Sequence, residues 1–222
     1  MAADIIVRPI EPEELDPALA MLARAFHDDP GGLIVEPDEA LRPAALKALF
    51  APVVRQAIPF SHVAVAERGG AIVGVATFLP PGHDTPSEDE LVAAGLPEAL
   101  ERVPAAAERM GPMVDFLEAQ HAKAIDGPHW RLEFFGVEPD LQGTGIGSRL
   151  IATGHDQADA AGERVYLETF TRKNVAWYEQ RGYAVVIEGV VPGTAIPVWG
   201  LIRDPRADGL AELGLGPRRA GR

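Results

Sequence analysis

The sequence predicts an α/β (α+β) fold, in which one sheet is flanked by helices. Seven short runs rich in β-branched and aromatic residues recur along the chain, and segments with helical spacing separate them. A glycine-rich turn near residue 143 joins a strand to a helix. Apolar residues fill 47% of the 222 positions, enough for a sizeable core. We expect one domain over residues 1–204 and a flexible tail, rich in Gly and Arg, at 205–222.

The chain begins with a short strand and a helix. Residues 5–10 read as an edge strand, and Asp16-Pro17 supplies an N-cap and a first-turn proline for a helix that ends near Asp28-Asp29. Gly31-Gly32 is expected to begin a mobile connection. The two aspartates could face a cationic substrate, but acidic residues also collect at such helix ends for ordinary turn reasons, and we favour the second explanation.

A second helical stretch and a hairpin follow. Residues 39–57 have helical spacing, but Pro43 and Pro52 interrupt them, so two short helices are an alternative. Residues 61–67 and 71–79 read as the two interior strands of a hairpin.

Residues 80–128 are rich in proline, alanine and acidic residues and have no strand signal. We expect a helical insert between the third and fourth strands. Ser87-x-x-Glu90 is a capping box, Gly95 is a helix stop, and Pro112 opens a further helical segment. The apolar face of that segment is formed by Met113, Phe116, Leu117 and His121. The insert is either a lid or wall over a substrate pocket, or a packing insert or dimer surface.

The central strand and the turn after it are the most informative stretch. Residues 130–137 are aromatic and β-prone, as in a strand. Gly143, Gly145 and Gly147 allow several N–H groups to point at one spot where a helix begins, and such a spot binds an anion, most often phosphate. The turn is not a P-loop, which needs Gly-Lys-Ser/Thr, and it lacks the third glycine of the dinucleotide fingerprint, where Ser148 stands.

Three strands and a short helix complete the chain. The strands are expected at residues 164–169, 183–188 and 198–203. The helix covers 174–181 and ends at Gly182.

Two sequence blocks point to a known family. Gln142-x-x-Gly145-x-Gly147, placed between a strand and a helix, resembles the acyl-coenzyme A pyrophosphate loop of the GNAT superfamily of N-acetyltransferases. In residues 167–183, Asn174 is followed by Tyr178 and then by Gly182-Tyr183, which looks like a second conserved segment of that superfamily.

The order of elements over residues 4–204 also resembles the GNAT fold. That resemblance implies a mixed, mostly antiparallel twisted sheet. Pro128-His129-Trp130, the helical insert and Trp199 are most similar to the puromycin N-acetyltransferase-like branch.

The resemblance implies acetyl-coenzyme A as co-substrate and no metal. Backbone groups of Phe135 and Val137 would pair with the pantetheine arm. A β-bulge near Gly136 would free an N–H for the thioester carbonyl, a donor worth about 3 kcal/mol of barrier. The expected cofactor-binding residues are Phe135, Gly136, Val137, Gln142, Gly143, Thr144, Gly145, Ile146, Gly147 and Asn174.

The candidate general base is Glu133. An amine must lose a proton before it attacks a thioester. Glu133 stands out in a largely apolar strand, and period-2 alternation puts it on the face of Phe135 and Val137. In the GNAT superfamily a carboxylate or histidine of this strand often serves as base, whereas the alternative is a salt bridge with a neighbour such as Arg131. Weaker candidates for the base are His121 and His129.

The candidate general acid is Tyr178. It follows Asn174 by four residues and therefore lies on the same helical face. It matches the tyrosine that the resemblance assigns as proton donor to the departing coenzyme A thiolate. The alternative is a packed aromatic residue whose hydroxyl is satisfied elsewhere.

Composition excludes several classes of function. A formal net charge of -13 argues against a general nucleic-acid binder and suits a cationic small substrate. No cysteine is present, which excludes a disulfide framework, a thiolate metal site and a cysteine nucleophile. The first residues lack a basic region before an apolar run, and no apolar segment is long enough to span a bilayer, so we expect a cytoplasmic protein without a membrane partner.

These observations together predict an acetyl-coenzyme A-dependent N-acetyltransferase that acts on a small amine by direct transfer in a ternary complex. The alternative is an acyl-coenzyme A-binding module that senses or regulates and catalyses little. The resemblance also allows a homodimer.

Overall fold

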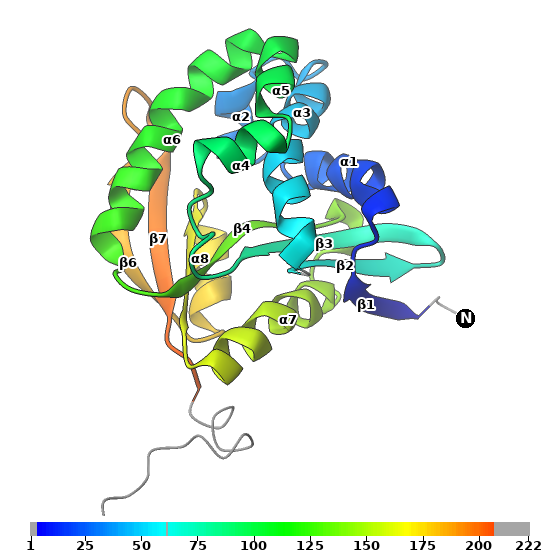
Figure 1. The fold of residues 1–222 in the computed structure, drawn as a ribbon, viewed down its shortest axis with the longest axis vertical. Coiled ribbons are helices and arrows are strands. Elements are labelled where there is room, and N and C mark those ends of the chain that lie inside the picture. Colours follow the sequence, from blue (N-terminus) through cyan, green and yellow to red (C-terminus); the bar gives the residue numbers. More distant parts are fainter. Residues whose placement is uncertain (1–3, 61, 207–222) are drawn as a thin grey trace, which may run out of the picture.

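The computed structural model describes residues 4–60 and 62–206, which form one seven-stranded sheet with helices on both faces (Figure 1). The strand order is β1-β2-β3-β4-β5-β7-β6, and all neighbours are antiparallel except β4 and β5. The predicted fold class is confirmed. The strands are β1 (Ile5–Pro9), β2 (Val63–Arg68), β3 (Ala71–Leu79), β4 (His129–Val137), β5 (Arg164–Thr169), β6 (Tyr183–Val190) and β7 (Pro197–Arg203).

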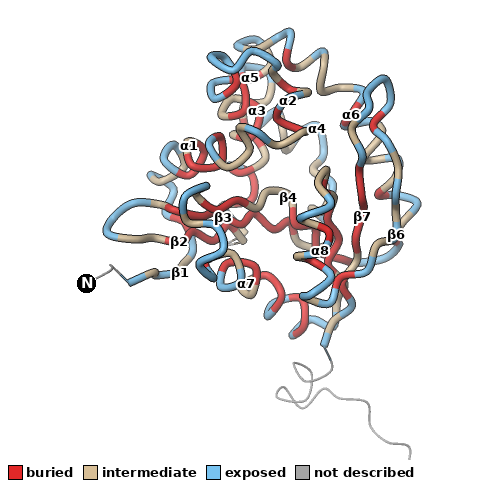
Figure 2. Tube along the Cα trace, turned by 180° about the vertical axis from the view of Figure 1, so that it is seen from behind, coloured by how far each residue is buried: buried red, intermediate tan, exposed pale blue. Residues whose placement is uncertain are grey.

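Helices cover the two faces of the sheet with separate apolar cores. Helices α1 and α3 pack on one face of β2 and β3, whereas α7 packs on the other. Buried residues therefore run along β3, between the two helical layers (Figure 2). The described α-helices are α1 (Leu15–Ala25), α2 (Pro30–Val35), α3 (Arg42–Ala57), α4 (Glu88–Ala93), α5 (Leu96–Arg102), α6 (Pro104–Ala124), α7 (Ile146–Ala161) and α8 (Arg172–Glu179). No helix in the described part of the chain has both the length and the apolar character needed to cross a membrane.

The expectation of a mobile connection at Gly31-Gly32 is wrong, because both glycines are buried in α2. Asp29 caps this helix, and its Oδ1 accepts a hydrogen bond from the Gly31 N–H at 2.9 Å. A Cβ on Gly32 would lie 2.3 Å from the Phe26 carbonyl oxygen. Close packing of α2 against the end of α1, rather than freedom of motion, explains this glycine.

Prolines interrupt fewer helices than the sequence suggests. Helix α3 is continuous, since Pro43 lies in its first turn and Pro52 is accommodated inside it. Pro52 is itself buried, and its neighbours Leu49 and Val54 belong to the core, so apolar burial offsets the lost backbone bond. Pro112 does not open a helix either, because it lies inside α6.

The insert forms α4, α5 and α6, as expected, and the capping box at Ser87 is present. Helix α6 runs beside β6 and β7 and also contacts α2 (Figure 1). On its inner face Met113 packs with residues of β7 and of the segment before it. Helix α6 therefore packs against the far half of the sheet, whereas α4 and α5 pack on α3.

A buried ion pair fastens β7 to α7. The Arg203 guanidinium donates two hydrogen bonds to the Asp159 carboxylate, at 2.8 and 2.7 Å. The Arg203 side chain is 2% exposed and that of Asp159 is 12% exposed. The Arg206 N–H adds a third bond to Asp159 at 2.8 Å. Residues 207–222, most of the tail expected to be flexible, lie outside the described residues.

Candidate active site

A cleft of about 950 Å³ opens where β4 and β5 diverge. Its walls are the end of α1 with the turn after it, the end of β4, the glycine-rich loop before α7, and α8. The sequence predicted the end of β4, the glycine-rich loop and α8 as parts of a cofactor site, and it left the aspartates after the first helix as an alternative. No residue described in the insert lines the cleft, so the insert is not a wall of this pocket.

Strand β4 has a free edge along the cleft. It pairs with β5 only over His129–Arg131, opposite Arg164–Tyr166, whereas its pairing with β3 continues to Val137. From residue 132 to 137, the peptide groups that face β5 therefore have no ladder partner. Unpaired backbone donors and acceptors at a strand edge can bind an extended ligand by strand addition.

The β-bulge is in β4, but at Glu133 and not near Gly136. Thr77 of β3 pairs with Phe134 and Phe78 pairs with Leu132, so Glu133 is the extra residue. A bulge resets the alternation of side chains. Phe134 therefore packs in the core of α1 and α3, while Phe135 and Val137 pack in the core of α7. The expectation that Glu133 shares the face of Phe135 and Val137 is wrong for this reason.

Glu133 instead joins a charged network around a buried arginine. Its Oε2 lies 3.1 Å from the Nε of Arg131, whose side chain is only 5% exposed. Arg131 also donates to Glu118 of α6 at 2.6 Å and lies 3.4 Å from Glu168 of β5. Burial raises the pKa of the Glu168 carboxyl. Glu133 does not line the cleft, and the ion pair with Arg131 is the alternative that the sequence left open. Its role as base stays a prediction.

The glycine-rich loop has the geometry of an anion site. Gly145 is the N-cap of α7 with φ of 91°, in the left-handed region. The first intrahelical bond of α7 runs from the Arg149 N–H to the Gly145 carbonyl, so the N–H groups before Arg149 are left for another partner. A Cβ on Gly147 would lie 3.2 Å from the Phe135 ring and 3.4 Å from the Trp177 ring, which keeps this position small.

The other loop residues hold the loop in place. The Gln142 side-chain amide donates to the Val137 carbonyl at 3.4 Å, and the Thr144 hydroxyl donates to the Leu141 carbonyl at 2.6 Å. Ile146 is buried in the core under α7. Thr144 and Ile146 do not line the cleft, so they could meet a ligand only through their backbone groups.

Asn174 and Tyr178 both face the cleft from α8, as their spacing predicted. The Asn174 Nδ2 donates to the Thr169 hydroxyl at 3.1 Å, which orients its amide. Tyr178 is buried with only 7% exposure and packs edge-on against Trp177 and Tyr183. Burial raises the pKa of the Tyr178 hydroxyl, and the nearby charge of Asp29 raises it further. A phenol is protonated at neutral pH even at its ordinary pKa of about 10, so the Tyr178 hydroxyl can donate.

Arg181 and Trp177 are cleft residues that were not found from the sequence. Arg181 lies 3.4 Å above the Trp177 ring, and its guanidinium donates to the Ser148 hydroxyl at 2.6 Å. This places a positive charge beside the N-terminus of α7. The second family segment spans both residues but gives neither a role, and the Trp-x-x-x-Arg spacing on a helix was the available signal.

Asp29 is an acidic residue of the cleft whose charge acts on the Tyr178 hydroxyl. It lines the cleft together with Tyr178 and Gly136. Burial raises the pKa of the Asp29 carboxyl, and the hydrogen bond from the Gly31 N–H offsets only part of this effect. The sequence favoured an ordinary turn role, and the N-cap bond confirms that role. Asp29 thus caps a helix and also presents a carboxylate to the cleft.

Comparisons with known structures agree with this fold. A crystal structure from Corynebacterium glutamicum, described as a histone acetyltransferase and related acetyltransferase, has 22% identity and a TM-score of 0.60, covering 93% of this chain and 98% of that one. The polyamine N-acetyltransferase of Drosophila melanogaster, which forms N-acetylagmatine, has 20% identity and a TM-score of 0.62, covering 90% and 100%. Arylalkylamine N-acetyltransferase 2 of Aedes aegypti has 15% identity and a TM-score of 0.62, covering 91% and 100%.

These structures share the fold at low sequence identity. The sequence model of the acetyltransferase (GNAT) family matches residues 33–183, which is more than half of the chain and includes the glycine-rich loop, Asn174 and Tyr178. The chain therefore belongs to the GNAT acetyltransferase family.

Proposed function

We propose that this protein transfers an acetyl group from acetyl-coenzyme A to the primary amine of a small molecule, by direct attack in a ternary complex. The observation that carries this proposal is the convergence of three features on one cleft. The free edge of β4, the glycine-rich loop and the Tyr178 hydroxyl all line it. A binding module would use the first two, whereas a buried, protonated phenol at the same place has a purpose in catalysis.

The described residues fit coenzyme A. The N–H groups at the start of α7 and the side chain of Arg181 would bind the pyrophosphate. Backbone groups of Phe135 and Val137 at the free edge would pair with the pantetheine arm, and Asn174 would contact it by its amide. Acetyl-coenzyme A would supply the acyl group as a reactive thioester.

Side chains at opposite walls of the cleft would move the protons. Tyr178 would give its phenolic proton to the departing sulfur, so that a thiol rather than a thiolate leaves. Asp29 would hold the acceptor ammonium and take one proton from it. The nitrogen loses a second proton as the amide forms, and this proton returns to the Tyr178 phenolate. Glu133, if it acts as base, would act from outside the cleft, beside Arg131.

A cationic small amine is the substrate class to test first. Asp28 and Asp29 place acidic groups at the cleft, and the chain carries a formal net charge of -13. The Drosophila and Aedes proteins of the same fold are named for amine acetylation. Membership of the puromycin N-acetyltransferase-like branch is a finer proposal, supported by Pro128-His129-Trp130, the insert and Trp199.

The proposed function is tested by titrating acetyl-coenzyme A calorimetrically and then following thiol release with a panel of amines. We expect micromolar binding and amine-dependent release. Gly145→Ala should bind about 10-fold more weakly, because a non-glycine residue relaxes out of the left-handed region and restoring it costs about 1–2 kcal/mol. Gly111→Ala, in an open position of α6, should bind like the wild type. Binding without release on any amine would favour the sensor, and no binding would refute both functions.

Asp29→Asn should raise the KM for the best cationic amine of that panel about 10- to 100-fold, the loss expected for one charge-assisted hydrogen bond. Asparagine is also a good N-cap, so α2 should be retained. The measurement is steady-state kinetics at saturating acetyl-coenzyme A. Asp38→Asn is the matched control, because Asp38 also accepts a bond from the N–H two residues on but lies outside the cleft. An unchanged KM in Asp29→Asn would remove Asp29 from the acceptor site.

A further inference from the structure

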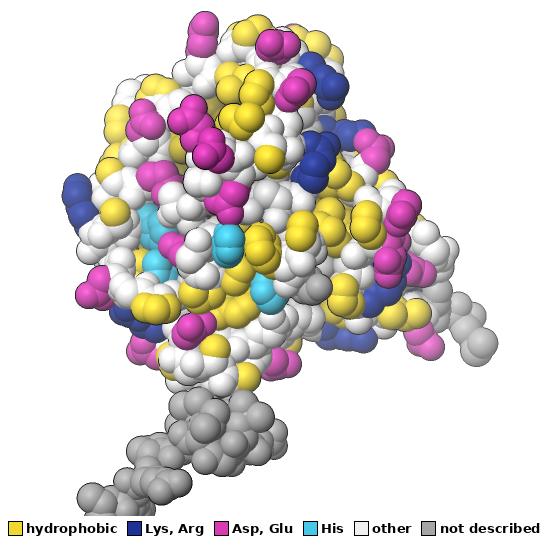
Figure 3. Space-filling view, in the orientation of Figure 1, with side chains coloured by type: hydrophobic (Ala, Val, Ile, Leu, Met, Phe, Trp, Pro, Cys, Tyr) yellow, Lys and Arg dark blue, Asp and Glu magenta, His cyan; other side chains and the backbone are white. Residues whose placement is uncertain are grey.

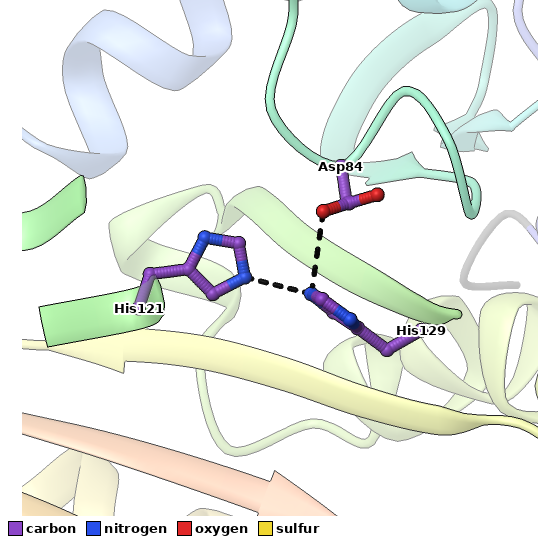
Figure 4. Close-up of side chains that lie close together, drawn as sticks. All are labelled: Asp84, His121 and His129. Carbon is purple, nitrogen blue, oxygen red and sulfur yellow. Dashed lines mark hydrogen bonds and ion pairs between the residues drawn. The ribbon is translucent and has the colours of Figure 1, made fainter. Parts of the chain in front are cut away.

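Asp84, His121 and His129 meet at the junction between the insert and the sheet (Figure 4). Asp84 precedes α4, His121 lies in the last turn of α6, and His129 is the first residue of β4. The two imidazoles are buried, with side chains 5% and 6% exposed. One ligand atom from each residue lies within 4.8 Å of those of the other two. None of the three lines the candidate active site. Histidine side chains (cyan) gather on this face of the molecule, below acidic ones (Figure 3).

Both rings are held so that Nε2 points inward. The Nδ1 of His129 lies 2.8 Å from the Gly127 carbonyl oxygen, which can only accept, so this nitrogen carries a proton. The Nδ1 of His121 faces the Glu118 carboxylate at 3.7 Å, again an acceptor. The two Nε2 atoms are 2.7 Å apart, and that of His129 lies 3.4 Å from the Asp84 Oδ2.

This arrangement gathers three potential electron-pair donors within 4.8 Å of one another. With its Nδ1 protonated, His129 has a lone pair at Nε2. His121 has one as well when its own Nδ1 proton faces Glu118, and Asp84 adds a carboxylate. They repel one another unless a cation lies between them. A single shared proton would join only two of the three groups, whereas a metal ion would join all three. A carbonyl or carboxylate behind Nδ1 is the support that metal-binding histidines have.

We propose that Asp84, His121 and His129 bind one Zn²⁺ ion that fastens the insert to β4. Two imidazoles and one carboxylate form a known zinc ligand set, which leaves a fourth position for water. Tetrahedral Zn²⁺ with bonds of about 2.0–2.1 Å separates its ligand atoms by about 3.3 Å. The distance of 3.4 Å between Asp84 and His129 matches this spacing. The histidine nitrogens, now 2.7 Å apart, must separate by about 0.6 Å, a small rotation of the His121 ring.

The site would stabilise the insert. The segment between Asp84 and His129 contains all of α4, α5 and α6, so the ion would close a loop around the whole insert. Closing a long loop removes freedom from the unfolded chain, and an ion that binds only the folded state adds stability by mass action.

The test uses the full chain without a histidine tag. The protein is dialysed against Zn²⁺, its metal content is measured, and its affinity is determined by competition with a chromophoric chelator. We expect one Zn²⁺ per chain and a Tm about 5–10 °C higher at a free Zn²⁺ concentration 100-fold above Kd. Co²⁺ in the same site should show the strong visible absorption of a four-coordinate ion.

Two variants and a control decide the assignment. His121→Gln and Asp84→Asn should each lose stoichiometric Zn²⁺ and the Co²⁺ absorption. Asp84 lies in a loop with its side chain 21% exposed, so Asp84→Asn should fold even if His121→Gln does not. His83→Gln is the matched control, because His83 belongs to the same insert but pairs with Glu90. Absence of stoichiometric Zn²⁺ in the wild type, or wild-type affinity in Asp84→Asn, would overturn the proposal.

Discussion

Replacing Tyr178 with phenylalanine should lower kcat by about 10²- to 10⁴-fold, the usual contribution of a positioned general acid. Tyr178 lines the cleft, and its hydroxyl is protonated at neutral pH because the ordinary pKa of a phenol is about 10 and burial raises it further. Without it the sulfur must leave as a thiolate. The affinity for acetyl-coenzyme A, measured by calorimetry, should stay within about 2-fold of the wild type, because the lost interaction acts only as the sulfur departs.

Tyr183→Phe is the matched control for this prediction. The Tyr183 hydroxyl pairs with the His155 Nε2 at 2.9 Å and lies outside the cleft. Its loss should lower stability by about 1 kcal/mol and leave kcat unchanged. If Tyr178→Phe turned over as fast as the wild type, the proton would have to come from another group, and Tyr178 would be a packing residue.

Asp159→Asn should lower the free energy of unfolding by about 3–5 kcal/mol, because it leaves the buried Arg203 guanidinium without its counter-charge. In a chain of this size that loss lowers Tm by about 6–20 °C. Urea denaturation at neutral pH measures it. Asp156→Asn, an exposed position on the same helix, should change stability by less than about 0.5 kcal/mol.

The stabilisation by Asp159 should depend on pH. Burial alone would raise the pKa of this carboxyl, but the bonds from Arg203 and Arg206 hold it below its ordinary value. A carboxylate with a lowered folded-state pKa stabilises the protein above the unfolded-state pKa of about 3.9, and this contribution is lost as the pH falls through the folded-state value. The stability difference between wild type and Asp159→Asn should therefore be constant near neutrality and shrink in acid. A difference that grew below pH 4 would contradict this assignment.

Local signals made most of the fold predictable from the sequence. The strand at residues 164–169 was placed correctly because a run of β-prone residues there is bounded by glycine and polar residues. The hairpin at 63–79 and the loop before α7 follow from alternation and from glycines at the turns. The predictions were wrong where tertiary packing, rather than local sequence, determines whether a helix forms. Pro52 and Gly32 carry breaker signals, but their helices are held by buried neighbours that no local pattern reveals.

The candidate site was less predictable, since several of its features are contacts between distant segments. The bulge at Glu133 has no sequence signature, yet it changes which face each later residue of β4 presents. Asp29 reaches the cleft only because α1 packs across β3 and β4. The pairing of His121 with His129 depends on how α6 meets β4, whereas Asn174 and Tyr178 were found because they lie one turn apart on the same helix.

The short contact between β4 and β5 also has a mechanical consequence. Within residues 4–60 and 62–206, three residue pairs join the half-sheet β1–β4 to the half-sheet β5–β7, fewer than join any other two neighbouring strands. Helix α7 contacts strands of both halves and therefore links them across the short contact between β4 and β5. A ligand bound in the cleft would contact both half-sheets and reduce their motion relative to each other. The separation of β4 from β5 thus forms the cleft and also allows a bound ligand to affect both halves of the sheet.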